Sequence, residues 1–149
     1  MTGITGYFNP KAEAMKEGAQ RYLGAESEIL VARTGSKILA LSAMSGLTHQ
    51  RGLEIKELVE RTLQSNKQKF MEVFSTLLYT EYGDNPNAQI KKVAGEAVVK
   101  YVQLLRDHES KTQRAENGLQ ISGASRQLGI DVGILADEMM SELRQLNRK

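Results

Sequence analysis

The sequence has 149 residues, of which 40% are hydrophobic and 26% are charged, with 20 Lys and Arg against 18 Asp and Glu. This composition is that of an ordinary globular protein, and the lack of cysteine excludes disulfides, thiolate catalysis and Cys-based metal sites. The net charge of +2 is small and spread along the chain, which argues against a strongly basic nucleic-acid-binding or membrane-binding surface.

The start of the chain, MTGITGYFNP, has no basic residue and no apolar block after it, so it does not resemble a secretory signal. No apolar run approaches the roughly 20 residues that span a bilayer. We therefore expect a cytoplasmic protein by default, with signal-less secretion or incorporation in a particle as alternatives. Residues 1–9 are expected to be mobile.

Two asparagine–proline pairs, Asn9-Pro10 and Asn85-Pro86, predict helix starts. Asparagine can cap free backbone amides, and proline at the first helical position has no amide proton to lose. Gly24 is predicted to end the helix that starts at the first pair, and Gly83 the helix that precedes the second pair, because glycine is common directly after a helix.

Residues 26–46 contain two short apolar runs, ILVA and ILAL, on either side of Thr34-Gly35. One interpretation is a short β-hairpin around residues 28–42, with the glycine in the turn. The other is a mostly buried helix that tolerates an internal glycine. We favour the helix, because the second run continues into Ala43 and Met44 without the alternation of a strand.

Residues 53–82 carry the longest helical stripe, at positions 55, 59, 62, 66, 70, 73 and 77. The stripe is compatible with one long helix. It is also compatible with two helices, because Ser65-Asn66 could cap a second one. We favour the break.

Residues 86–108 form the clearest amphipathic pattern of the chain. Lys92, Glu96 and Lys100 follow one another at four-residue spacing on the polar side, as expected for a solvated helix face. The apolar side comprises Ile90, Val93, Ala94, Ala97, Val98, Tyr101, Leu104 and Leu105.

The segment from Ser122 to Met140, SGASRQLGIDVGILADEMM, resembles the generic bacterial helix-turn-helix template, with Gly129 in the turn. In such motifs the second helix presents basic and hydrogen-bonding side chains to DNA. Here it would present Asp137, Glu138 and Glu142, which repel phosphate. We therefore interpret residues 122–146 as packed helices that do not read DNA, and keep a DNA-binding regulator as the alternative.

Histidine, the usual general base near neutral pH, occurs only as His49 and His108. Both lie among polar residues and are expected to be exposed rather than catalytic. No nucleophile, phosphate-loop, dinucleotide or metal motif is present in the sequence. We predict no catalytic, cofactor-binding or metal-binding residue, and no cofactor.

Together these features predict an all-α, single-domain helical bundle over residues 1–149, with five or six helices. We expect a non-enzymatic module for protein–protein interaction or assembly, whose partner is another protein or a second copy in a homo-oligomer. The candidate partner contacts are Ile38, Leu41, Met44 and Val99. The alternative, nucleic-acid binding, would use Lys91, Lys92, Lys100, Arg106, Arg126 and Arg144.

Overall fold

The computed structural model describes residues 10–79 and 88–147, which form four α-helices and no strand. The helices are α2 (Pro10–Ser45), α3 (His49–Tyr79), α4 (Ala88–Arg114) and α5 (Gly118–Asn147). The prediction of an all-α bundle is confirmed, and the prediction of five or six helices is wrong. The expected mobility of residues 1–9 and the predicted features at Gly83 and Asn85-Pro86 lie outside the described residues.

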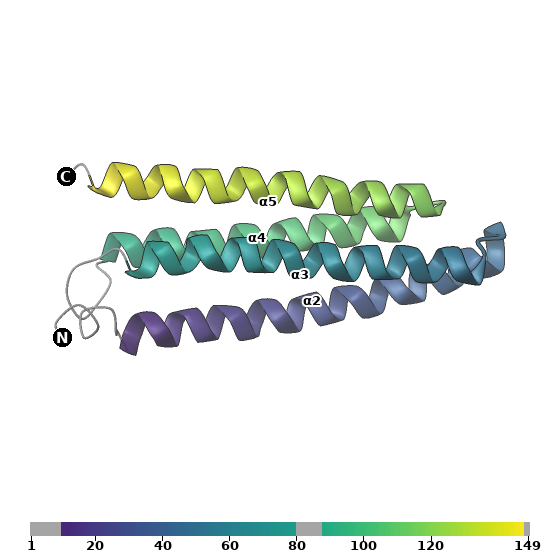
Figure 1. Ribbon diagram of the computed structural model, residues 1–149, viewed down its shortest axis with the longest axis horizontal. Coiled ribbons are helices and arrows are strands. Elements are labelled where there is room, and N and C mark those ends of the chain that lie inside the picture. The colour runs from purple at the N-terminus through teal and green to yellow at the C-terminus, as the bar shows by residue number, and fades with distance from the viewer. Residues whose placement is uncertain (1–9, 80–87, 148–149) are drawn as a thin grey trace.

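The bundle consists of two antiparallel helical hairpins, α2 with α3 and α4 with α5, packed side by side (Figure 1). The hairpins are placed so that α2 lies next to α4 and α3 next to α5, each pair running in parallel. Helices α3 and α4, although consecutive, lie across the diagonal of the bundle. The start of α2 and the end of α5 consequently lie at the same end of the molecule.

Contacts along the helices fix this arrangement. Arg33 Nη1 of α2 lies 2.6 Å from Glu109 Oε1 of α4, and one turn further Lys37 Nζ donates to the carbonyl of Gln113 at 2.7 Å. The contacts move four residues forward along both helices, as expected for two parallel helices. On the opposite side, Gly129 and Gly133 of α5 face side chains one turn apart on α3 in the same order.

Helix α2 is continuous through Thr34 and Gly35, so the hairpin predicted around residues 28–42 is wrong and the favoured helix is confirmed. Leu30, Thr34, Ile38 and Leu41 are buried on one face, at the three- and four-residue spacing of a helix. The packing of this stripe offsets the cost of internal glycine, about 1 kcal/mol. For the same reason α2 does not end at Gly24.

The break favoured at Ser65-Asn66 is also wrong, because α3 is one helix. Asn66 does not cap a helix. Its side chain is buried between helices, with Oδ1 at 3.8 Å from the position that a β-carbon on Gly129 would occupy. The asparagine amide thus fills space that the glycine of the neighbouring helix leaves free.

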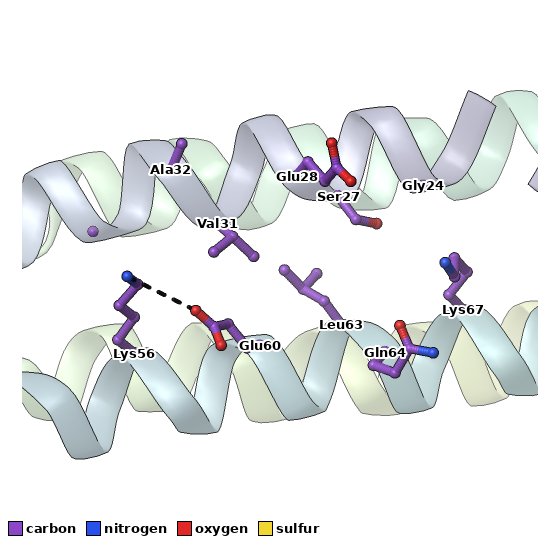
Figure 2. A pocket seen from close by; sticks show the side chains of 11 residues that line it. Gly24, Ser27, Glu28, Val31, Ala32, Lys56, Glu60, Leu63, Gln64 and Lys67 are labelled. Carbon is purple, nitrogen blue, oxygen red and sulfur yellow. Dashed lines mark ion pairs between the residues drawn. The ribbon is translucent and has the colours of Figure 1, made fainter. Parts of the chain in front are cut away.

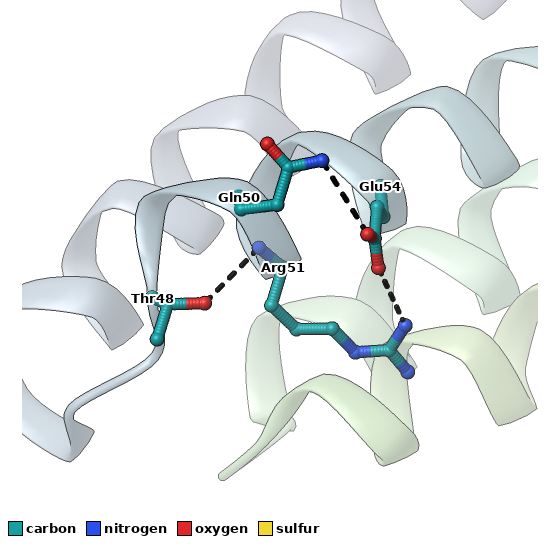
Figure 3. A network of polar contacts seen from close by, with 4 residues as sticks. All are labelled: Thr48, Gln50, Arg51 and Glu54. Carbon is teal, nitrogen blue, oxygen red and sulfur yellow. Dashed lines mark hydrogen bonds and ion pairs between the residues drawn. The ribbon is translucent and has the colours of Figure 1, made fainter.

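Local sequence signals do account for the helix ends where residues 46–48 join α2 to α3 and residues 115–117 join α4 to α5, which we call the closed end of the bundle. Thr48 caps α3, since its Oγ1 accepts a hydrogen bond from the Arg51 amide at 3.1 Å (Figure 3). Gly46 precedes it with φ of 73°, a left-handed conformation that favours glycine. Asn117 caps α5 through the Gln120 amide at 3.0 Å. Helix α2 begins at Pro10, as predicted.

The core contains a cluster of three aromatic residues from α3 and α4. Phe70 packs on Phe74 and on Tyr101, with ring centroids 5.7 Å and 4.6 Å apart. Burial raises the pKa of the Tyr101 hydroxyl, which has no hydrogen-bond partner among the described residues. Near the start of α2 and the end of α3, the Tyr79 hydroxyl donates to Glu13 and links α3 to α2. Partial burial, followed by this bond to Glu13, raises the pKa of Tyr79 to about 12.

Candidate functional site

A groove of about 530 Å³ lies between α2 and α3 (Figure 2). Small residues of α2, including Gly24 and Gly35, form one wall, and the long side chains of Lys56, Glu60 and Lys67 from α3 form the other. Lys56 Nζ and Glu60 Oε1 lie 4.0 Å apart. Both groups are about half exposed, so this ion pair contributes little free energy.

Some of the polar groups of this groove are engaged within their own helices, as Lys56 and Glu60 are in α3. The Ser27 hydroxyl donates to the carbonyl of Leu23 at 2.8 Å, which is a bond inside α2. The lysines and glutamates balance in charge. The side chains that line this groove are therefore not arranged as a cluster aimed at one reacting atom.

Among residues 10–79 and 88–147, His108 and Ser125 have the spacing of a nucleophile and its base. His108 Nε2 lies 3.0 Å from Ser125 Oγ, within the range of a serine–histidine pair. His108 is only 2% exposed and Ser125 is equally buried, and neither lines any of the described grooves. His108 Nδ1 has no partner among the described residues that would orient the ring. We therefore assign the pair to the core.

The expectation that His108 is exposed is wrong, whereas His49 is exposed. Burial is the main reason that the pKa of His108 falls to about 4, and Lys111 lowers it further while Glu109 raises it. The imidazole is thus neutral at physiological pH.

The structure separates the four candidate partner contacts into two groups. Ile38 and Leu41 are buried in the bundle and present no surface to a partner. Met44 near the end of α2 and Val99 in the middle of α4 are 86% and 69% exposed. The difference arises because Ile38 and Leu41 face the other helices, and α2 extends beyond the helix that would cover Met44.

The segment that resembles a helix-turn-helix is a single helix. Helix α5 runs through residues 122–146 without a turn, and Gly129 lies inside it against Asn66. The predicted pair of helices at this segment is therefore wrong, and no separate recognition helix exists there.

The cations of the alternative hypothesis do not form one surface. Lys91, Lys92, Lys100, Arg106, Arg126 and Arg144 are all exposed. They belong to two helices and surround them, and Lys100 Nζ lies 3.8 Å from Glu138 Oε2. Nucleic-acid binding by this chain remains an untested prediction.

Sequence reasoning did not predict that Leu39 and Leu53, near the end of the α2/α3 hairpin, are exposed. Leu39 is 71% exposed, and with Leu53 it borders a hollow of about 310 Å³ that also includes His49 and Gly52. The available signal was the position of Leu39 directly after buried Ile38, which turns it by about 100° around the helix and away from the core.

Comparison with known proteins gives no match to a protein family, to a curated protein or to a solved structure. Within the described residues, no helix is long and apolar enough to cross a bilayer. In the same part of the chain, no three His, Asp or Glu side chains are grouped so that they could hold a metal ion.

Proposed function

We propose that this chain is a non-enzymatic, cytoplasmic assembly module that acts by binding protein, in the first place a second copy of itself. The observation that carries the proposal is the exposure of large apolar side chains on the outside of a well-packed bundle. These residues are Tyr22, Ile29, Leu39, Met44, Leu53, Val99, Leu119, Ile130 and Ile134, each at least 44% exposed.

Single exposed apolar residues are ordinary, whereas grouped ones indicate a contact surface. Leu39 and Leu53 meet at one hollow, and Met44 lies on the same hairpin end. Burying such side chains in a complex yields about 25 cal/mol for each Å² of apolar surface. The exposed apolar residues therefore favour association over an isolated monomer.

Size-exclusion chromatography with light scattering tests this function. We expect the mean mass of the purified chain to rise with protein concentration. High salt should not abolish the association, because apolar contacts are not screened. A constant monomer mass at every concentration, together with no protein partner recovered from the native cells, would contradict the proposal.

A further inference from the structure

The two hairpins of the bundle differ in length at the closed end, which leaves a step. Helix α4 ends at Arg114, and Lys37 of α2 already reaches its last turn through the carbonyl of Gln113. Helix α2 continues to Ser45, so its residues 38–45 extend about 12 Å further at 1.5 Å per residue. Figure 1 shows the α2/α3 hairpin projecting past the α4/α5 hairpin.

The projecting part of α2 continues the face that packs inside the bundle. Met44 follows buried Leu41 by three residues, the spacing that carries the α2 core stripe forward. Met44 is nevertheless 86% exposed, because no helix continues α4 at this level. Ala40 and Ala43 are exposed beside it, and their small side chains permit close approach of another helix. An interface of the bundle is thus left uncovered at its end.

The projecting end of α2 and the segment that joins it to α3 are also free of charge over an unusual length. No residue from Ile38 to Gln50 is Asp, Glu, Lys or Arg, in a chain that is 26% charged. The flanking cations are engaged: Lys37 binds the Gln113 carbonyl, and Arg51 Nη1 lies 3.1 Å from Glu54 Oε2 (Figure 3). Two copies can therefore bring these ends together without placing like charges in contact.

We propose that a second copy of this chain covers the step, with the projecting ends of the two α2 helices side by side and antiparallel. This inference rests on the proposed function and specifies its surface. In this dimer the projecting end of each α2 lies next to the last turn of α4 in the other copy. Both copies therefore use the same surface, as a two-fold dimer requires. The contact is short, which places it with weak, concentration-dependent dimers.

Cross-linking tests the proposal, because the natural chain has no cysteine and a single substitution adds the only thiol. Met44→Cys is compared with Val99→Cys, which places a thiol at an exposed site in the middle of α4. Under mild oxidation or with a short bis-maleimide, we expect dimers to form on the order of tenfold faster through Cys at position 44, because association raises the local thiol concentration. Adding Ala40→Glu to Met44→Cys should remove this advantage.

The outcomes separate the surface from the function. Equal or faster cross-linking of Val99→Cys, in a chain that light scattering shows to associate, would contradict the projecting end and leave the assembly function standing. Slow cross-linking of both variants in a chain that stays monomeric would contradict self-association itself. Circular dichroism of each variant establishes that it is folded before the rates are compared.

Discussion

His108 is an imidazole placed where it cannot take up a proton without loss of stability. Its ring is buried, its Nε2 is bonded to Ser125, and burial lowers its pKa to about 4. The charges that act on it come from α4, with Lys111 lowering the pKa and Glu109, itself paired with Arg33 of α2, raising it. The neutral ring is therefore part of the packed state.

The stability of the bundle should consequently depend on pH. An unfolded histidine has a pKa near 6.5, so between about pH 6.5 and pH 4 the unfolded chain binds more protons than the folded one. Protons then favour unfolding, and the free energy of unfolding should fall by up to about 3 kcal/mol as the pH drops through this window. His108→Asn, which cannot titrate but can still bond to Ser125, should lose this dependence.

Urea midpoints measured between about pH 4 and pH 8 check the prediction. His49→Asn is the matched control, because it removes the exposed histidine and should retain the slope of the natural chain. A midpoint that does not change between about pH 6.5 and pH 4 would show that His108 does not titrate as described.

The burial of His108 could have been predicted from spacing, whereas its charged neighbours suggested exposure. Tyr101, Leu105, His108 and Thr112 follow one another at intervals of four, three and four residues and are all buried. Adjacent residues on a helix point about 100° apart, so Asp107 and Glu109 say nothing of where His108 points.

At the scale of the helix, the sequence predicted the start of α2 at Pro10 correctly and predicted too many ends. Gly24, Asn66 and Gly129 were interpreted as ends or turns, and all three lie inside helices. Glycine and asparagine weaken a helix locally, but these three lie where two helices face each other. Tertiary packing decided their structure, and a single sequence does not show which residue of another helix will lie opposite.

Gly52 gives a measurable case of such close approach. A β-carbon at this position would lie 2.9 Å from Ile38 Cγ2, in the contact between α3 and α2. Gly52→Ala should therefore destabilise the bundle by up to about 2 kcal/mol, because overpacking costs about 1–3 kcal/mol and the gain in helix propensity is about 1 kcal/mol. Chemical denaturation measures the difference.

Gly18→Ala is the matched substitution, because a β-carbon there meets nothing within 4 Å inside the same kind of helix. It should stabilise the bundle by about 0.5–1 kcal/mol. If both alanine variants were stabilised alike, the contact of Gly52 with Ile38 would not limit the approach of the two helices.

At the scale of the molecule, the helical class could be predicted from the sequence and the arrangement could not. The stripes show which face of each helix is buried, but not that α2 lies beside α4 or that α3 and α4 lie diagonally. The same limit affected the candidate site. Two apolar runs were recognised in residues 26–46, but the sequence did not show that Leu41 is buried in the bundle and that Met44, three residues further along, is exposed.

Small-angle X-ray scattering over a concentration series tests the central claim, that the uncovered end of α2 joins two copies end to end. Helix α2 is about 54 Å long at 1.5 Å per residue, and an overlap of about 12 Å would give a dimer nearly twice as long as the monomer. The maximum dimension should therefore nearly double as the mass doubles, and Met44→Glu should abolish both changes. A dimer with the same maximum dimension as the monomer would contradict the claim, since the two bundles would then lie alongside each other over their full length.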